Sequence, residues 1–404
     1  MYSQILKNTN YFKIVIAQIV NRLGDSIDAI AMSWLIFSLN NNSALTALNL
    51  GINFIPTVFI QPFAGSYVEK MNHKCIIVIM DVIRGTIVTI IAISTLIGIT
   101  KDWMILIATF LLSTAEAFRI PAANAIIPSL VEKDNYSQAL SLQASLTRVS
   151  ELIGMGIAGI VIGALKIHGA IIIDALSFFV SASIILTIPT NNFQTTSTNS
   201  SVLKDFKSGL RYLKNSHKIF FFCIIGMAIN ALLTPINSLE TVLCADIYQK
   251  NAQLLSLIGI ATTIGSLLGA FSFPYLEKYI REKFLITAFL LLTGLFYLSC
   301  IFNVYLLKYN ILFYTSIILF NFILGYGAAF MSAYASVNLL KKVDQTYLAR
   351  VSALSSAICT GAIPICSFII SILSVKYNVI VIFNIVAVLS LITGIMYLIL
   401  RKEK

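Results

Sequence analysis

Charged side chains recur inside stretches of this sequence that are otherwise apolar enough to lie in a membrane. An ionised side chain in hydrocarbon is costly, so such groups normally face a bundle interior or a water-filled cavity. Carboxylates placed there can exchange protons, and arginine–carboxylate pairs can join neighbouring helices. The first half contains nine such residues: Arg22, Asp25, Asp28, Asp81, Arg84, Glu116, Arg148, Glu151 and Asp174. Since the second half offers only Glu240, the pattern indicates a polar route concentrated in the first half.

Most of these residues form opposite-charge pairs three positions apart, which places both partners on one helix face. The rise of a helix puts Asp25 and Glu116 near the middle of the membrane. A carboxylate in such a cavity can bind and release protons near neutral pH. We therefore expect proton coupling at these two residues, with Arg22 and Asp28 as neighbours of Asp25. The alternative is a permanently paired structural triad of Arg22, Asp25 and Asp28.

A second group of charges lies nearer the inner face. Paired charges at an inner mouth commonly link helices and keep that side closed, so we expect a gating network; direct contact with a ligand is the alternative. Its members inside or beside the spans are Asp81, Arg84, Arg119, Arg148 and Glu151.

Polar residues and prolines also interrupt two of the apolar stretches. Proline breaks the hydrogen-bond ladder of a helix, and polar neighbours can then line a cavity. Pro56 and Pro235 each lie in such a stretch. Glu240 is expected in a substrate pocket or outer gate, or alternatively in water at the outer interface. The candidate residues of a substrate cavity are Asn53, Gln61, Asn230, Asn237 and Glu240.

Composition supports a membrane protein. Of 404 residues, 58% are hydrophobic and only 11% are charged, against about 25% charged in soluble domains. The six cysteines are scattered singly, so we expect inert thiols, no metal site and no disulfide framework. The sequence has no phosphate-binding glycine–lysine loop and none of the common hydrolase motifs. We expect neither an enzyme nor a cofactor.

Apolar runs predict an all-α membrane protein with twelve spans, since about twenty apolar residues cross a bilayer. The first six are expected at 12–39, 44–68, 75–99, 103–127, 139–165 and 168–189. The second six are expected at 218–246, 253–276, 283–307, 310–339, 347–374 and 377–400. Twenty of the 28 lysines and arginines fall on one side of this layout and five on the other. The positive-inside rule then predicts cytoplasmic termini.

The same distribution explains the net charge of +11 as a topology signal that attracts anionic lipid, and it argues against nucleic-acid binding. The layout predicts a six-helix bundle over 1–189, a cytoplasmic linker over 190–217 and a second six-helix bundle over 218–404. Apolar residues at helical spacing within 202–218 predict an amphipathic helix on the inner membrane surface, or a helix that only joins the two halves.

Several stretches resemble one branch of the major facilitator superfamily, the bacterial proton-driven exporters that include macrolide efflux pumps and the enterobactin exporter. The stretches are, in order, Arg22–Ser26, Trp34–Phe37, Pro121–Val131, Asp174–Phe178, Ser208–Leu213 and Tyr347–Val351. They cover essentially the whole chain in the right order, and none is specific for a substrate.

The resemblance implies a monomer in the bacterial cytoplasmic membrane that works by alternating access. Its expected partners are protons, membrane lipids and a small hydrophobic or amphipathic substrate such as an antibiotic, metabolite, siderophore or peptide. It also implies a gate latch in the loop after the second span, where Glu69, Lys70 and Lys74 keep the charges of the superfamily pattern but not its arginines. A lipid or lysolipid translocator of the same fold and a non-transporting receptor or accessory protein remain as alternatives.

Overall fold

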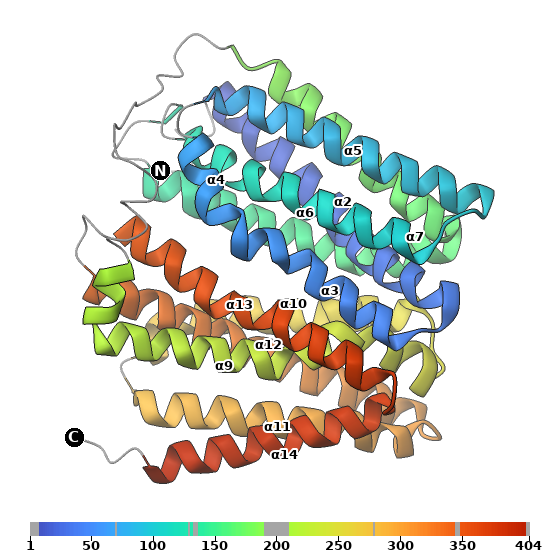
Figure 1. The fold of residues 1–404 in the computed structure, drawn as a ribbon, viewed down its shortest axis with the longest axis vertical. Coiled ribbons are helices and arrows are strands. Elements are labelled where there is room, and N and C mark those ends of the chain that lie inside the picture. The colour runs from blue at the N-terminus through green and yellow to red at the C-terminus, as the bar shows by residue number, and fades with distance from the viewer. Residues whose placement is uncertain are drawn as a thin grey trace. The chain divides into compact units, whose positions relative to one another are not determined.

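The computed structural model describes residues 8–68, 71–127, 130–131, 136–189, 210–277, 279–343 and 348–400. These ranges fold into helices joined by short turns, with no strand among them (Figure 1). The helices of the first half are α2 (Thr9–Asn40), α3 (Ser43–Phe59), α4 (Gln61–Val68), α5 (His73–Ile97), α6 (Asp102–Ala125) and α7 (Tyr136–Leu186). The second half contains α9 (His217–Val242), η3 (Leu243–Ile247), α10 (Ala252–Leu276), α11 (Glu282–Leu306), α12 (Asn310–Lys342), α13 (Leu348–Ser374) and α14 (Val379–Leu400).

The predicted second span is broken into two helices, α3 and α4, at Ile60. Pro62 has no backbone N–H, so it cannot donate to the carbonyl one turn earlier. The turn is closed instead by the N–H of Ile60 on the Pro56 carbonyl at 2.8 Å and by the N–H of Ala64 on the Ile60 carbonyl at 2.9 Å. The interruption of this apolar stretch therefore lies between α3 and α4.

Helix α7 covers two of the predicted spans, 139–165 and 168–189. Lys166 interrupts it with φ 60° and ψ −179°, a backbone conformation outside the helical region. This residue falls in the turn expected between 139–165 and 168–189. Within α7, the segment Ser145–Leu186 is apolar over 42 residues, about twice the length that one crossing needs.

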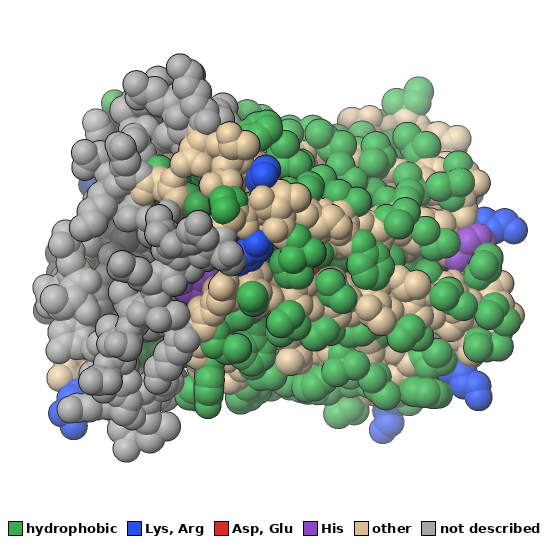
Figure 2. All heavy atoms as spheres, turned by 90° about the horizontal axis from the view of Figure 1, so that it is seen from above, with side chains coloured by type: hydrophobic (Ala, Val, Ile, Leu, Met, Phe, Trp, Pro, Cys, Tyr) green, Lys and Arg blue, Asp and Glu red, His purple; other side chains and the backbone are tan. Residues whose placement is uncertain are grey.

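Ten helices in the described part of the chain are long and apolar enough to cross a membrane. Helix α2 is not among them because Arg22, Asp25 and Asp28 dilute its apolar residues, although it has 32 residues. The count of twelve spans, the two six-helix bundles and the cytoplasmic termini stay predictions. On the face shown in Figure 2, apolar side chains cover most of the described surface and acidic side chains are almost absent. Such a surface suits lipid better than water.

The described residues form two compact units, one from those within 1–40 and 52–205 and the other from those within 41–51 and 206–404. In the first, α2 packs mainly on α7, and α5 packs on both α6 and α7. In the second, the main helix pairs are α10 with α12, α11 with α14, and α9 with α13. The four helices α2, α5, α6 and α7 carry the charged residues of the first half.

The predicted linker lies mostly outside the described residues, which resume at Leu210. Residues 210–215 are helical, as expected. Leu213 is buried in an apolar cluster with Ile219, Cys223 and Val351. The described end of the linker is therefore anchored to the second unit through Leu213, while Leu210 is exposed.

Helices α10 and α12 approach each other closely enough to require glycine. A Cβ atom on Gly265 would overlap the backbone carbonyl of Phe322, and one on Gly325 would overlap the carbonyl of Thr262. Ser266 adds a hydrogen bond from its hydroxyl to the Gly325 carbonyl at 3.2 Å. Small residues that let backbones touch are a common device for joining membrane helices, because lipid supplies no hydrophobic drive for association.

We predict that Gly325→Ala lowers the free energy of unfolding by about 1–3 kcal/mol, because the backbone opposite cannot move aside as a side chain can. The matched control is Gly394→Ala in α14, where the added methyl group meets flexible leucine side chains. Thermal unfolding of the purified protein in detergent measures both. Equal loss in the two variants would contradict the close approach of α10 and α12.

Candidate functional site: a buried charge network in the first unit

The centre of the network is the carboxylate of Asp81 in α5, which is completely buried. The guanidinium of Arg119 in α6 forms an ion pair with it through Nε. The hydroxyl of Ser181 in α7 donates to Asp81 Oδ2 at 2.7 Å, and the Asn21 amide in α2 donates to Oδ1 at 3.3 Å. One helix therefore carries this buried negative charge, and residues of three other helices stabilise it.

One turn further along α5, Arg84 forms a second ion pair. Its Nη2 donates to Asp25 Oδ1 of α2 at 2.7 Å. Its Nη1 donates to the side-chain oxygen Oδ1 of Asn21 at 3.5 Å, so Asn21 bridges the Asp81 and Arg84 pairs. The Arg84 guanidinium also lies over the Phe178 ring of α7, 4.2 Å from the centroid, a favourable place for a cation.

The two ion pairs differ in their access to solvent. The Asp81 side chain is 0% exposed, whereas that of Asp25 is 18% exposed. A buried pair is stable only when further hydrogen bonds compensate for lost hydration, and Asp81 receives these from Asn21 and Ser181. Asp25 is the more exposed of the two carboxylates.

A separate cluster links α2 to α7 near the surface. Glu151 accepts from Arg22 at 3.0 Å and from Arg148 at 2.8 Å. The side chain of Arg148 is 63% exposed, so the Arg148 pair contributes little to stability.

Of the three opposite-charge pairs spaced three residues apart, Arg148 and Glu151 pair within one helix, whereas Asp81 and Arg84 pair with residues of other helices. Arg22 pairs with Glu151 rather than Asp25, and Arg84 pairs with Asp25 rather than Asp81. Neighbours three apart do share a helix face, but here that face contacts other helices that offer better-placed partners. The proposed triad of Arg22, Asp25 and Asp28 is therefore not the arrangement found.

Helices α2 and α7 touch near the remaining acids of this unit. A Cβ on Gly24 would overlap Ser177 and the carboxylate of Asp174, so glycine permits this contact. The Ser177 hydroxyl donates to Asp174 at 3.3 Å. One oxygen of Asp28 is buried without a hydrogen-bond partner among the described residues.

Glu116 of α6 lies close enough to Asp25 and Arg84 to interact with them electrostatically. No ion pair joins it to the network in the part of the chain that the structure describes. It is therefore a neighbour of the Asp25 pair rather than a member.

The proposed gate latch is only partly described. Glu69 and Lys70 lie outside the described residues. Lys74 donates from Nζ to the backbone carbonyl of Ile188 at 2.5 Å, at the end of the α7 segment. It thus joins the start of α5 to the chain after α7, away from the Asp81 network.

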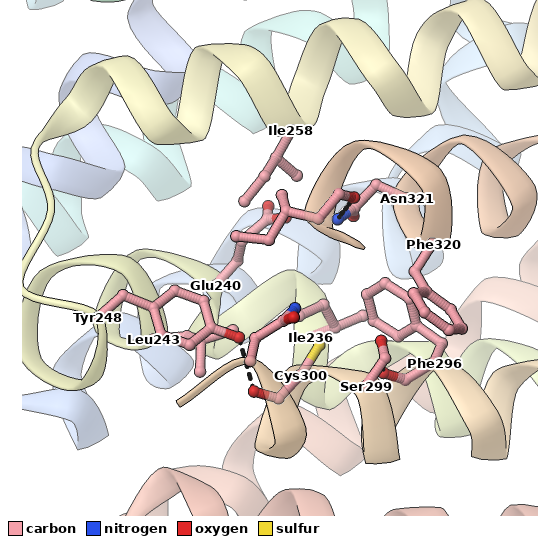
Figure 3. Close-up of a pocket in the computed structure, with 12 residues that line it drawn as sticks. Ile236, Glu240, Leu243, Tyr248, Ile258, Phe296, Ser299, Cys300, Phe320 and Asn321 are labelled. Carbon is pink, nitrogen blue, oxygen red and sulfur yellow. Dashed lines mark hydrogen bonds between the residues drawn. The ribbon is translucent and has the colours of Figure 1, made fainter. Parts of the chain in front are cut away.

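The polar residues expected in a substrate cavity lie in both units, and that they line one cavity stays a prediction. Asn53 and Asn237 are exposed, Gln61 is half-buried, and Asn230 donates to the carbonyl of Gly226 in its own helix at 3.0 Å. Of the five, Glu240 alone lines the cavity found in the second unit, shown in Figure 3. No group of three or more His, Cys, Asp or Glu side chains that could hold a metal ion is present among the described residues.

Sequence reasoning missed Asn21, Ser181 and Phe178 as members of the network. Ser181 follows Asp174 and Ser177 at intervals of about one turn, so the periodicity of α7 could have indicated it. Asn21 directly precedes Arg22 and is uncharged, so the pattern of charged residues does not indicate it. Only the hydrogen bonds from Asn21 to Asp81 and from Arg84 to Asn21 reveal its role.

We predict that Asp81→Asn lowers the free energy of unfolding by about 3–5 kcal/mol, because it leaves the Arg119 guanidinium buried without a compensating charge. Arg148→Gln also removes one partner of an arginine–carboxylate pair, but at an exposed site, and is expected to cost less than about 1 kcal/mol. Thermal unfolding in detergent compares them. A similar small loss for both would show that the Asp81 pair is not a buried structural interaction.

Comparison with known proteins supports a membrane transporter. Macrolide efflux protein A of Streptococcus pyogenes is 22% identical over 360 residues, covering 88% of this chain and 87% of that protein. The staphyloferrin A transporter of Staphylococcus aureus is 22% identical over 394 residues, covering 95% and 94%.

The fold is shared with solved transporters. The nucleoside transporter NupG superposes with a TM-score of 0.78 at 15% identity, covering 98% of this chain and 100% of that one. A bacterial homologue of ferroportin in an inward-facing state gives 0.72 at 13% identity, covering 96% and 98%. The family profile described as transmembrane secretion effector matches residues 4–404. The chain therefore belongs to this family of major facilitator superfamily transporters.

Proposed function

We propose that this protein exports small hydrophobic or amphipathic compounds from a bacterial cytoplasm by proton antiport and alternating access. The family and the efflux proteins among its relatives support the direction of transport. The observation that carries the coupling is the Asp25–Arg84 ion pair, which joins α2 to α5 and leaves the Asp25 side chain partly exposed.

Coupling follows from competition for one carboxylate. In the ion-paired state, Asp25 Oδ1 accepts from Arg84 at 2.7 Å. A proton that binds Asp25 removes the negative charge that holds Arg84, so the link between α2 and α5 weakens. In the reverse step, return of Arg84 to Asp25 favours release of the proton. Proton binding is thus tied to the relative position of two helices.

The residues around this pair have distinct roles in the proposal. Glu116 is placed to attract Arg84 when Asp25 is protonated, because it already interacts with that guanidinium. Asp28 and Arg22 lie one turn either side of Asp25 on α2 and modify the field that it experiences. The Asp81–Arg119 pair, which joins α5 to α6, stays intact and holds these two helices together.

The proposed substrate class follows from the second unit, where Glu240 is the acid identified within a predicted span. A mainly apolar wall suits hydrophobic or amphipathic cargo better than strongly charged cargo. Lipid-headgroup flipping in proteoliposomes would distinguish a lipid translocator from an exporter of such compounds.

We predict that Asp25→Asn abolishes proton-driven export, because asparagine cannot exchange a proton at this site. Cells that carry the wild type, the variant or no transporter are compared for resistance to a panel of macrolides and other amphipathic antibiotics. Efflux of a responding compound is then measured in vesicles with an imposed pH gradient.

The control is Asp246→Asn, which removes an exposed carboxylate of the second unit outside the network. It should transport as the wild type does. Unchanged gradient-driven efflux by Asp25→Asn would rule out Asp25 as the coupling residue. Absence of any export by the wild type would rule out the proposed function for the compounds tested.

A further inference from the structure

The cavity of the second unit is lined by residues of five helical elements, α9, η3, α10, α11 and α12, together with Tyr248 (Figure 3). Its volume of about 10 Å³ is about that needed by one water molecule. Its polar lining consists of Glu240, Tyr248, Ser299, Asn303 and Asn321, with apolar residues and Cys300 completing the wall. No lysine, arginine or histidine is among the described lining residues.

The hydrogens of these polar groups are largely used elsewhere. The Tyr248 hydroxyl donates to the Cys300 carbonyl at 2.7 Å, and the Ser299 hydroxyl donates to the Phe296 carbonyl at 2.7 Å. The Asn321 amide donates to the Ile317 carbonyl at 2.9 Å. What these side chains can still offer the cavity is mainly oxygen lone pairs.

Asn303 provides the independent observation that points to a ligand. Its side chain is 2% exposed, and its Oδ1 is buried without a hydrogen-bond partner among the described residues. A buried amide oxygen left unpaired costs free energy. Asn303 also interacts with the Tyr248 phenol, so its oxygen is the atom left to be satisfied.

Glu240 supplies negative charge to the same space. In Figure 3 its side chain and that of Asn321 extend toward each other. None of the described ion pairs involves Glu240. Its titratable neighbours are Cys244, Tyr248, Tyr297 and Cys300, none of which carries positive charge.

The backbone beside the cavity also favours a cation. Helix α9 ends in the π-helical turn η3, and Leu243 of this turn lines the cavity. Such turns are rare and often occur at functional sites. The C-terminal end of a helix carries partial negative charge, and helix ends of this kind can help to hold sodium in transporters.

We propose that this cavity is a binding site for one sodium ion, held by Glu240 and Asn303 with the oxygens of Ser299 and Asn321 beside them. Oxygen ligands suit a hard cation. A single carboxylate balances one charge in a low-dielectric interior, which favours a monovalent over a divalent ion. The small volume favours sodium over the larger potassium ion. The site lies in the unit that lacks the charge network, so it goes beyond the proposed proton coupling.

The test is direct binding of ²²Na⁺ to the purified full-length protein in detergent, in buffer that contains choline as the only other monovalent cation. We expect about one sodium per chain, displaced by unlabelled NaCl and much less well by KCl. Glu240→Gln should abolish binding, and Asn303→Ala should weaken it at least tenfold. Asp246→Asn, which removes an exposed acid at the same helix end without lining the cavity, should bind as the wild type does.

Thermal unfolding in choline alone confirms that each variant is folded, and Asn303→Ala keeps the test open if Glu240→Gln does not fold. NaCl should raise the Tm of the wild type, by about 2 °C or more, and leave that of the cavity variants unchanged. Absence of sodium binding, or binding unchanged in both cavity variants, would mean that the cavity holds only water. Neither result depends on export, so failure here is distinct from failure of the proposed function.

Discussion

Compensation of buried charge is the constraint on which the first unit depends. Asp81 is completely buried, and it is held by Arg119 together with Asn21 and Ser181. A charge in this position cannot be left alone, because complete burial removes its hydration. Helices α2, α5, α6 and α7 must therefore assemble together, and the polar contacts fix their register more specifically than apolar packing could.

The two ion pairs of the network differ in how fully their carboxylates are buried and compensated, which suits one to a structural role and the other to a functional role. Both arginines are buried, and Asp25 is the more exposed of the two carboxylates. Asp81 has three partners in fixed positions, whereas Asp25 has a single guanidinium on one oxygen. The Asp81–Arg119 pair is thus suited to hold helices together, and the Asp25–Arg84 pair is suited to break and form again. Among its described residues the second unit has no ion pair, and close glycine contacts join α10 to α12.

Much of the fold could be predicted from the sequence because apolar runs and their polar breaks encode membrane helices directly. The helix ends agree with the expected spans to within a few residues, and the proline bend at Ile60 was anticipated. The charged residues of the site were found for the same reason. Their partners were not, because partner choice depends on which helices meet. The oxygen-lined cavity could not be predicted from the sequence, since nothing distinguishes Asn303 and Asn321 from other polar residues in apolar helices.

The sharing of Asn21 between two ion pairs has a consequence for how this sequence can diverge. A single substitution at Asp25, Asp81, Arg84 or Arg119 strands an opposite charge, whereas joint replacement by apolar residues can be neutral or stabilising. Selection for stability therefore opposes single substitutions at these four positions. Among distant relatives, the four charges should be inherited together or lost together, and their correlated substitution would record the contact between these helices in sequence alone.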